Sequence, residues 1–425
     1  MKPHPIAGAL CALLLAGCAD RADGPEPADL LIASGTVFIG DASGPREADV
    51  VIQGDRIAYV GPDGAARYGA RRTIDATGRI VAPGFIDPHT YIRSDDARER
   101  RNAPWLFQGV STIFIGVDGG GPPDVADQGA WFEEHGVGPN IGQYVGFGAV
   151  RRQVLGQLAH APDEAELGLM RTLVADAMCE GAFGLSAGLF YVPQSFAETG
   201  EVVALAREAA IRGGIYDTHQ RDESSYSTGL LGSVSEALEI GRRADIPVHF
   251  AHIKALGADV HGQAGEVVAL IEQARAQGQR VTADQYPWLA SGSSLGSALL
   301  PRWSVDGGRA AFLRRMDDPQ TAARIHRAMA ENLARRGGAE ALLLTGRGWP
   351  WSGQTLQAIA EDWGTGPVEA ALRILDAGDN AAPDAQPAGR VASFNMDRDD
   401  VDLFMRQPWV VTSSEVITGF INFWQ

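Results

Sequence analysis

A regular alternation of apolar strands and amphipathic helices between residues 163 and 286 is the feature that most restricts the fold. Most of these helices end near a Gly, and the strands after them end in polar side chains. His219, His252 and Asp284 close three successive strands at intervals of 33 and 32 residues. Each interval is about the length of one strand, one helix and their two connections. The spacing therefore predicts a parallel sheet built from βα units.

Eight parallel strands are expected. Helices in the clearest stretch are expected at 163–180, 201–212, 234–243 and 265–277, and the strands after them at 182–186, 215–219, 247–252 and 280–284. Further strands are expected near 85–89, 112–116, 141–148 and 409–412. This count favours an α/β fold with a (β/α)8 TIM-like barrel, in which catalytic residues gather at the C-terminal ends of the strands. A doubly wound open sheet is the rival, but it would not bring the ends of many strands to one point.

The barrel is expected to occupy residues 84–425, with an insertion at about 300–400 that contains helices and one extra strand near 342–344. Long insertions of this kind often cover an active site as lids. Before the barrel, residues 28–83 alternate short apolar runs with turn signals, which predicts a small N-terminal β-sandwich domain.

The N-terminus reads as an export signal. Lys2 and the apolar run 6–15 precede Leu15-Ala16-Gly17-Cys18, which resembles a bacterial lipobox. We therefore expect a lipoprotein signal peptide at 1–17, a lipid-modified Cys18 and a polar tether at 18–27. An ordinary secretory signal, with Cys18 incidental, is the alternative. Either interpretation predicts an exported protein, and the lipobox favours a periplasmic protein anchored to a bacterial membrane, the outer membrane in preference.

The charge balance limits the partners of the chain. The 425 residues include 36 basic and 53 acidic side chains, for a net charge of −17. This excess argues against binding nucleic acid, which needs Lys and Arg against the phosphates. It also leaves the lipid at Cys18 as the expected membrane contact. Three Cys residues are too few for a disulfide framework, so a small-molecule enzyme is the favoured class.

Four polar residues at strand ends are candidate metal ligands: His89, Asp118, His219 and His252. A hydrolytic zinc site needs three protein ligands and an open position, and imidazole and carboxylate are suitable ligands. One His at a strand end would more often be structural. Only 9 His occur in the chain, so three of them at strand ends with barrel spacing are unlikely to be an accident.

Five segments resemble the D-aminoacylase (N-acyl-D-amino-acid deacylase) branch of the amidohydrolase superfamily: Pro83-Gly84-Phe85-Ile86-Asp87-Pro88-His89, Gly184-Leu185-Ser186, Thr218-His219-Gln220-Arg221-Asp222-Glu223, His252-Ile253-Lys254-Ala255-Leu256-Gly257 and Asp284-Gln285-Tyr286-Pro287. The resemblance runs from about residue 28 to about residue 415. It implies a zinc-dependent barrel that hydrolyses the amide of an N-acylated D-amino acid or a related dipeptide.

The resemblance assigns roles to single positions. It implies that His219 and His252 hold the tightly bound zinc, and that Asp118 stands where the best-known members place a bridging Cys. Tyr191, Lys254 and Tyr286 match positions that hold the carboxylate of the substrate. For Lys254 a surface location is the alternative, and for the two Tyr a place in the core.

The run Arg221-Asp222-Glu223 has two interpretations that the residues leave open. Its side chains could orient His219 from behind the metal, or they could be solvated charges at the start of a helix.

Three departures from the family pattern bear on activity. The family's His-x-His is His89-Thr90-Tyr91 here, and a phenol is a poor zinc ligand at neutral pH, so the second metal site should be impaired and His89 should serve that site or the bound water. The family's Ser-Asp-Gly is Ser414-Glu415-Val416 here. Glu415 then takes the place of the Asp that is the catalytic base, and its carboxylate lies one methylene further from the backbone. The chain also ends at Gln425, before the family's last barrel helix and C-terminal sandwich strands, which are expected to be missing.

Two hypotheses follow. In the first, the chain is a zinc-dependent amidohydrolase in which Glu415 takes a proton from zinc-activated water and passes it to the leaving amine. In the second, it is a catalytically impaired or truncated relative, either an exported binding protein or a non-functional fragment. The sequence leaves open the acyl group, the amino-acid side chain, the D preference and the oligomeric state.

Overall fold

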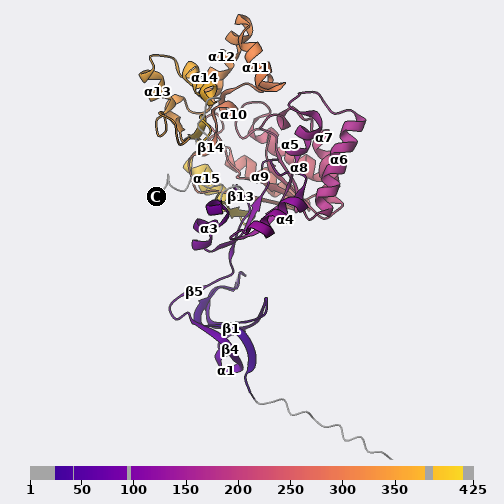
Figure 1. Ribbon diagram of the computed structural model, residues 1–425, viewed down its shortest axis with the longest axis vertical. Helices are drawn as coiled ribbons and strands as arrows, with labels where there is room; N and C mark the ends of the chain where they lie inside the picture. The colour runs from indigo at the N-terminus through magenta and orange to yellow at the C-terminus, as the bar shows by residue number, and fades with distance from the viewer. Residues whose placement is uncertain (1–23, 42, 93–96, 379–385, 415–425) are drawn as a thin grey trace, which may run out of the picture. The chain divides into compact units, whose positions relative to one another are not determined.

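The structure is a computed structural model that describes residues 24–41, 43–92, 97–378 and 386–414 (Figure 1). The chain divides into two compact units, Met1–Gly84 and Phe85–Gln425. This division lies one residue after the boundary expected from the sequence. The expected signal peptide, the lipidation site Cys18, the base Glu415 and the expected C-terminal gap all lie outside the described residues.

The first unit is a single mixed sheet with the order β3-β2-β1-β4, in which β5 also pairs with β1. Its elements are β1 (Glu26–Val37), β2 (Arg46–Gln53), β3 (Arg56–Gly61), α1 (Gly64–Arg67), β4 (Tyr68–Asp75) and β5 (Ile80–Val81). The twelve-residue β1 pairs with β4 along its first part and with β5 at its end. The described strands of this unit therefore belong to one hydrogen-bonded sheet, and the sandwich expected from the sequence stays a prediction. β1 also begins at Glu26, inside the expected tether.

The second unit contains the parallel strands that the sequence predicts. They are β6 (Phe85–Asp87), β7 (Val110–Ile115), β8 (Asn140–Gln143), β9 (Val145–Gly146), β10 (Gly184–Gly188), β11 (Ile215–His219), β12 (Val248–Phe250), β13 (Val281–Gln285) and β17 (Val410–Thr412). They form two sheets, β6-β7-β8 and β17-β13-β12-β11-β10-β9, in which every pairing is parallel. Adjacent strands therefore follow chain order, as in a βα series.

The closed barrel that we expected is not formed by backbone pairing among the described residues. Between the two sheets, Tyr144 separates β8 from β9 and interrupts what the sequence predicts as one strand. At the other edge, the backbone N–H of Ser414, just after β17, donates to the Asp87 carboxylate at the end of β6 (3.2 Å). A side chain, rather than a strand ladder, joins these two ends.

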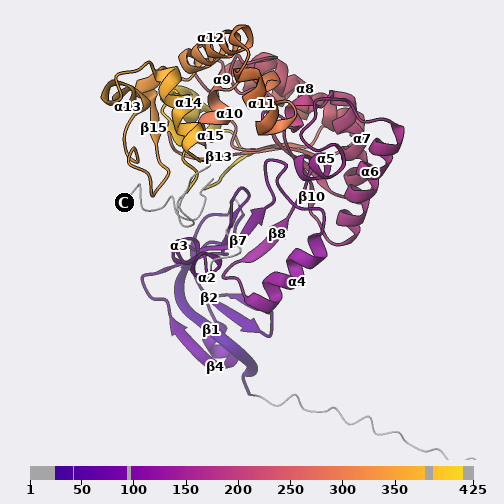
Figure 2. The ribbon, with the colours of Figure 1, turned by 45° about the horizontal axis from the view of Figure 1, so that its top comes forward.

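Consecutive helices pack against one another and against the sheets. They are α2 (Ala97–Arg100), α3 (Ala103–Phe107), α4 (Val125–His135), α5 (Phe147–Leu155), α6 (Glu164–Cys179), η1 (Gln194–Phe196), α7 (Thr199–Ala210), α8 (Gly229–Ala244) and α9 (Ala264–Ala276). Contacts run from α5 to α6, α7, α8 and α9 in turn, and Figure 2 shows α6, α7 and α8 along the parallel strands. The helix starts are specified locally. For example, Asp163 and Glu166 form a reciprocal capping box at α6.

The insertion has its own hydrophobic core. Its elements are β14 (Ser291–Ser294), α10 (Leu295–Leu299), η2 (Arg302–Val305), α11 (Gly308–Met316), α12 (Pro319–Arg335), η3 (Ala339–Ala341), β15 (Leu342–Leu344), α13 (Leu356–Asp362), α14 (Pro367–Ala377) and β16 (Arg390–Ser393). The one extra strand expected near 342–344 is part of a three-stranded sheet, β14-β16-β15. After it, α15 (Arg398–Met405) packs against α9 and leads into β17.

The insertion contacts the loops that follow β10 and β11. The Arg302 guanidinium donates to the carbonyl of Phe190 (2.7 Å) and lies over its ring. The Tyr226 hydroxyl donates to the carbonyl of Ala298 (3.1 Å) and accepts from Arg336 (2.6 Å). The insertion therefore lies against the end of the sheet at which the candidate ligands gather.

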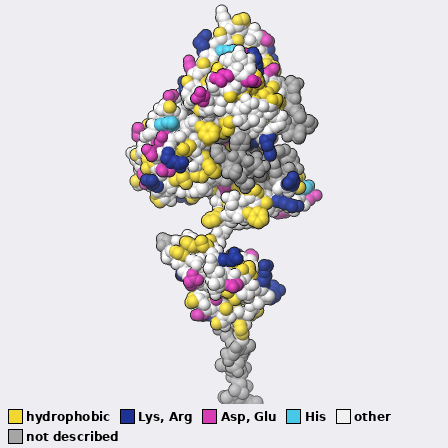
Figure 3. Space-filling model, turned by 90° about the vertical axis from the view of Figure 1, so that its left-hand side faces the viewer, with side chains coloured by type: hydrophobic (Ala, Val, Ile, Leu, Met, Phe, Trp, Pro, Cys, Tyr) yellow, Lys and Arg dark blue, Asp and Glu magenta, His cyan; other side chains and the backbone are white. Residues whose placement is uncertain are grey.

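The surface carries both signs of charge. On the face drawn in Figure 3, acidic and basic side chains are interspersed. Across the part of the chain that the structure describes, no helix combines the length and the apolar character that a membrane crossing requires.

Candidate metal centre

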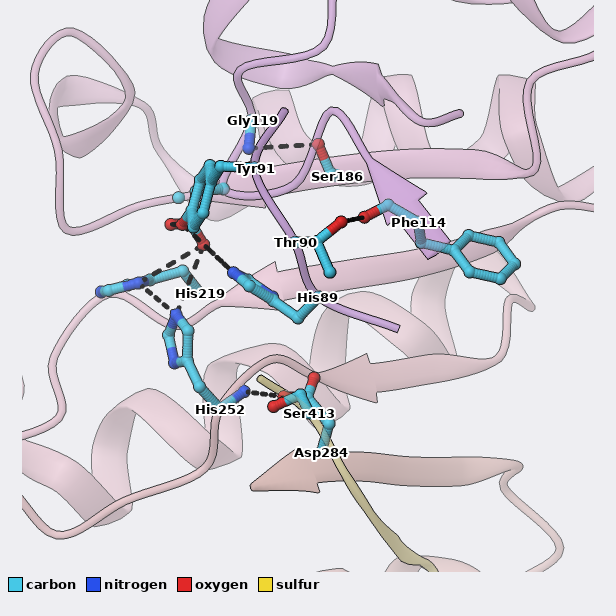
Figure 4. Close-up of polar contacts among 12 residues, drawn as sticks. His89, Thr90, Tyr91, Phe114, Gly119, Ser186, His219, His252, Asp284 and Ser413 are labelled. Carbon is cyan, nitrogen blue, oxygen red and sulfur yellow. Dashed lines mark hydrogen bonds and ion pairs between the residues drawn. The ribbon is translucent and has the colours of Figure 1, made fainter. Parts of the chain in front are cut away.

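The four ligands expected from the sequence meet at the C-terminal ends of their strands. His89 lies two residues after β6, Asp118 three residues after β7, His219 ends β11 and His252 follows β12 by two residues. Figure 4 shows the His219 and His252 rings facing each other beside His89 and Tyr91. Because strands of both parallel sheets end at this site, residues up to 163 positions apart in the sequence come together.

Three of these side chains converge closely enough to share a metal ion. Asp118 Oδ1 lies 3.5 Å from His219 Nδ1 and 3.4 Å from His252 Nε2. Two ligands bound to a tetrahedral zinc at about 2.0–2.2 Å lie about 3.3–3.5 Å apart, so both distances to Asp118 match. The two imidazole nitrogens are closer, at 2.9 Å, and would have to move apart by about 0.4 Å to bind one ion. Asp118 Oδ1 is also buried without a hydrogen-bond donor among the described residues. Such an oxygen is costly unless a cation engages it, so the donor set fits a zinc ion.

Glu223 lies behind the two imidazoles. Its carboxylate is 3.2 Å from His252 Nδ1 and 3.7 Å from His219 Nε2, the nitrogens opposite to those that face Asp118. His219, Glu223 and His252 are close enough to hold an ion themselves, as are His89, Asp118 and His252. We favour an ion on the Asp118 side, because a carboxylate on the far nitrogen is the common way to orient a metal-bound imidazole.

Lys254 and Glu223 form a buried ion pair. Lys254 Nζ lies 2.8 Å from Glu223 Oε1 and 2.6 Å from His252 Nδ1. Both side chains are almost fully buried, with exposures of 2% and 6%. Burial alone would raise the pKa of Glu223, but the Lys254 ammonium and the neighbouring imidazoles hold it well below its ordinary value. Glu223 is therefore a carboxylate at neutral pH, able to accept a proton from either His.

Two of the candidate ligands have backbone conformations that residues other than Gly rarely adopt. The φ angles of Asp118 and His252 are +55° and +35°, in the left-handed region. Non-Gly residues in this region persist where the surroundings enforce them, and they cluster at functional sites. The geometry that aims Asp118 and His252 at each other is therefore imposed by their loops.

The loop of Asp118 is held by two polar side chains. Ser186 Oγ accepts from Gly119 N (3.1 Å) and donates to the carbonyl of Gly116. Gln194 donates to the carbonyl of Asp118 (2.9 Å) and accepts from Gly188 N (2.7 Å). A Cβ on Gly188 would collide with the Asp118 carbonyl oxygen, so this close approach requires Gly.

The loop of His252 is held by Asp284 at the end of β13. The Asp284 carboxylate accepts from the backbone N–H of His252 (3.0 Å), from His249 Nε2 (3.0 Å) and from Ser413 Oγ. Burial would raise the pKa of Asp284, but the hydrogen bond from His249 and nearby imidazoles hold it below its ordinary value. Asp284 therefore joins β12, β13 and the chain after β17 at the floor of the site.

His89 and Tyr91 complete the cluster on the other side of Asp118. His89 Nε2 lies 3.1 Å from Tyr91 Oη and 3.7 Å from Asp118 Oδ1. Tyr91 Oη donates to Asp118 Oδ2. Burial lowers the pKa of His89 to about 4, so its ring is neutral at physiological pH.

The remaining predicted site residues surround this cluster. The ring of Tyr191 lies 4.7 Å from that of His219. Tyr286 is buried, with its hydroxyl 3.6 Å from Met396 Sδ and its ring 5.5 Å from Lys254 Nζ. Tyr191 and Lys254 therefore lie beside the metal cluster, and Lys254 is buried rather than on the surface. Tyr286 packs in a small core with Met396 and Val401. The role of the three residues in carboxylate binding remains a prediction.

The run Arg221-Asp222-Glu223 is not a solvated stretch. Arg221 forms an ion pair with Glu236. Asp222 accepts from the backbone of Ser224, Ser227 and Gly229 and so shapes the loop before α8. Glu223 is the member of this run that lies beside His219, so the interpretation as a side chain that orients His219 from behind the metal applies to Glu223.

Comparison with known proteins agrees with this geometry. No family model matches the chain. It is 36% identical over 293 residues to a D-aminoacylase of Alcaligenes xylosoxydans xylosoxydans, which covers 64% of this chain and 59% of that protein. An N-acyl-D-glutamate deacylase from Bordetella bronchiseptica, solved with zinc and a phosphonate mimic of the tetrahedral intermediate, superimposes with a TM-score of 0.73 and 27% identity, over 92% of this chain and 76% of that one.

The chain is a homologue of the D-aminoacylases. A further D-aminoacylase structure, described by one-metal activation and second-metal attenuation of a binuclear centre, superimposes with a TM-score of 0.71 and 28% identity, over 91% of this chain and 76% of that one. The chain spans about three fifths of the length of the curated D-aminoacylase relatives that it matches.

Several residues that shape this D-aminoacylase-like site were missed from the sequence. Gln194 stands in a loop without periodicity, so nothing marks it as a support of Asp118. Ser186 and Asp284 belong to the quoted family segments, but no role followed from the pattern alone. The pairing of Glu223 with Lys254 joins residues 31 positions apart. That separation, about one βα unit, was the available signal.

Proposed function

We propose that this chain is a zinc-dependent amidohydrolase that hydrolyses the amide bond of N-acyl-D-amino acids or related dipeptides. The observation that carries the proposal is the convergence of Asp118, His219 and His252, with Asp118 Oδ1 at about the distance from each imidazole nitrogen that two zinc ligands keep. Homology to D-aminoacylases supports the class of reaction and of substrate.

We infer that the parallel strands form a (β/α)8 barrel with the site at its C-terminal rim. The strand order in support runs β6 to β13 and then β17 along the chain. The contacts of Asp87 with Ser414 bring the first and last of these strands together at the site. Eight strands result when β8 and β9 are counted as the two halves of one interrupted strand.

The chemistry divides between the metal and the protein. Zinc, when bound, would lower the pKa of a water molecule and polarise the acyl carbonyl. Glu223 would fix the two imidazoles from behind and keep the proton on their far nitrogens. Lys254 has three donors. The ion pair with Glu223 uses one of them, and with the proton of His252 on Nδ1 the other two are available to a substrate carboxylate. Tyr191 and Tyr286 would add phenol donors at the same end.

Glu415 is the proposed general base. It follows Ser414, whose backbone contacts Asp87 at the rim. A carboxylate there would accept the proton of the attacking water and return it to the leaving amine. Glu415→Gln should abolish turnover while leaving the zinc content unchanged, whereas a variant of a ligand should lose both.

The proposal is tested by metal content and hydrolysis together. We expect the purified protein to retain zinc and to release free amino acid from N-acetyl-D-amino acids more rapidly than from the L forms. His219→Ala should lose both properties. His160→Ala, a change of a half-exposed imidazole between α5 and α6, is the matched control and should keep both. A wild-type protein that holds no zinc and hydrolyses no N-acyl-D-amino acid would refute the proposal.

A second candidate is an exported binding protein of impaired activity. The contact of Tyr91 with Asp118 favours it, because a His in the family pattern is replaced here by a phenol. Zinc binding and saturable binding of N-acyl-D-amino acids without turnover would distinguish this candidate from the enzyme.

We also propose that the protein is exported and anchored through a lipid on Cys18. The lipobox-like Leu15-Ala16-Gly17-Cys18 is the support. Expressed in a bacterial host with radiolabelled palmitate, the wild type should incorporate label and fractionate with membranes. Cys18→Ser should do neither.

A further inference from the structure

The hydroxyl of Tyr91 lies between two groups that a second cation would also need. His89 Nε2 is 3.1 Å from Tyr91 Oη, and Oη donates to Asp118 Oδ2. The rings of His89 and Tyr91 meet edge to face at 5.5 Å. The single oxygen of the Tyr91 hydroxyl thus contacts both His89 Nε2 and Asp118 Oδ2.

The number of protons fixes the direction of both hydrogen bonds. A carboxylate only accepts, so the single proton of Tyr91 goes to Asp118. Tyr91 Oη must then accept from His89, which places a proton on His89 Nε2. A nitrogen that carries a proton has no lone pair to offer a metal. The phenol therefore withdraws the near nitrogen of His89 from metal binding.

The two oxygens of Asp118 are divided in the same way. Oδ2 accepts from Tyr91. Oδ1 is buried without a hydrogen-bond donor among the described residues and faces His219 Nδ1 (3.5 Å) and His252 Nε2 (3.4 Å), with His89 Nε2 farther away at 3.7 Å. In a two-metal site each oxygen of such a carboxylate could bind a different cation. Here Oδ1 is available to one cation, and Oδ2 accepts the hydrogen bond of the Tyr91 phenol.

We propose that Tyr91 limits this site to one metal ion, because its phenol takes the place of a second cation between His89 and Asp118 and orients the remaining oxygen of Asp118 toward the first. The proposal rests on the proposed function, since it takes Asp118, His219 and His252 as the ligands of a zinc ion. It adds a determinant of metal number and a positioning role for a residue that does not itself bind the metal.

The experiment measures zinc per chain and zinc affinity in four proteins. Wild type, Tyr91→His, Tyr91→Phe and Tyr216→Phe are stripped, dialysed against a zinc buffer and analysed by mass spectrometry of the metal. Tyr216→Phe is the matched control, since its hydroxyl is buried on β11 without a hydrogen-bond partner among the described residues. Circular dichroism establishes that each variant is folded.

The expected results differ between variants. Wild type and Tyr216→Phe hold one ion with equal affinity. Tyr91→His holds two, because an imidazole replaces the phenol and releases His89. Tyr91→Phe holds one ion about 10- to 100-fold more weakly, the usual effect of removing a partner behind a metal ligand.

The outcomes separate this proposal from the one on which it rests. A wild-type protein with no zinc would remove the proposed function. A wild-type protein with two ions, or a folded Tyr91→His protein with one, would overturn the assignment of Tyr91 alone. Near-ultraviolet absorbance of tyrosinate on zinc loading of the wild type would also overturn the assignment of Tyr91, since Tyr91 would then be a metal ligand. If Tyr91→His does not fold, an unchanged affinity in Tyr91→Phe overturns the proposal.

Discussion

Replacing Glu223 by Gln should lower both the stability of the metal-free protein and its affinity for zinc. The change keeps the shape of the side chain and removes its charge. Lys254, 2.8 Å away and 2% exposed, then retains an ammonium group without its counter-ion. His252 and His219 lose the carboxylate that faces their far nitrogens.

The size of each effect follows from this burial. Removing one partner of a buried ion pair costs roughly 3–5 kcal/mol, because the other charge stays buried. Gln still offers an oxygen to Lys254, so we expect about 3 kcal/mol, the lower end of that range. Loss of the partner behind two ligands should weaken zinc binding by about 10- to 100-fold.

Tryptophan fluorescence in urea is a suitable assay, since all nine Trp residues lie after Gly84 and report on the second unit only. A double-mutant cycle with Lys254→Met isolates the pair, and the double variant should recover much of the loss. Glu369→Gln, which breaks an exposed pair with Arg373, should change stability by less than about 1 kcal/mol. If Glu223→Gln unfolds at the wild-type urea midpoint and binds zinc equally well, the buried pair does not support the site.

Three other changes test the supports of the site. Ser186→Ala leaves the buried N–H of Gly119 without an acceptor and should cost about 1–3 kcal/mol in urea unfolding, whereas Ser195→Ala, whose hydroxyl has no hydrogen-bond partner among the described residues, should be neutral. The pKa of Asp284 is held below its ordinary value by His249. The contribution of Asp284 to stability is therefore complete above about pH 4 and is lost as the pH falls through the lowered pKa. In a series of urea midpoints measured at decreasing pH, Asp284→Asn should lose less stability below about pH 4 than the wild type. Removal of zinc by a chelator should lower the melting temperature, and readded zinc should restore it in proportion to the logarithm of its concentration. A chelator without effect on the wild type would contradict a bound ion.

The repeating part of the fold could be predicted because its signals are local. The strand expected at 215–219 is β11, and the helices expected at 163–180 and 265–277 begin and end within a residue or two of α6 and α9. Each combines an apolar face with a cap or a terminal Gly, so neighbouring residues suffice to identify it.

The sheet of the insertion could not be predicted, because its strands depend on pairing. β14 is Ser291–Ser294, a run of Ser and Gly with no alternating pattern. It pairs with β16, about a hundred residues later. The interruption between β8 and β9 at Tyr144 is likewise invisible in a segment that is apolar on both sides. Burial and pairing, which the sequence does not display, decide these elements.

The residues of the candidate site likewise fall into those that the sequence could place and those that it could not. His219 and His252 could be placed together because each stands at a strand end, one βα unit apart. Glu223 and Lys254 have nearly the same separation, but the sequence does not show that their side chains meet, because side-chain direction in a loop is set by the surrounding fold. From the sequence, Tyr91 reads as the loss of a ligand. The structure shows it as a donor to Asp118, which is a different physical role.

This difference changes what the departures from the family pattern mean for activity. In the homologous D-aminoacylase, one metal activates and the second attenuates. If Tyr91 excludes a second ion, as proposed, it leaves the proposed zinc ligands His219 and His252 unaffected. Glu415, where the family pattern has Asp, concerns the proposed base instead, and an extra methylene can misplace such a base by about 1 Å, a shift that can cost about a hundredfold in rate. Tyr91→His and Glu415→Asp should therefore act on different quantities, the first on the number of bound ions and the second on turnover at fixed metal content. Equal effects of both variants on turnover, with zinc content unchanged, would show that Tyr91 belongs to the catalytic machinery rather than to metal selection.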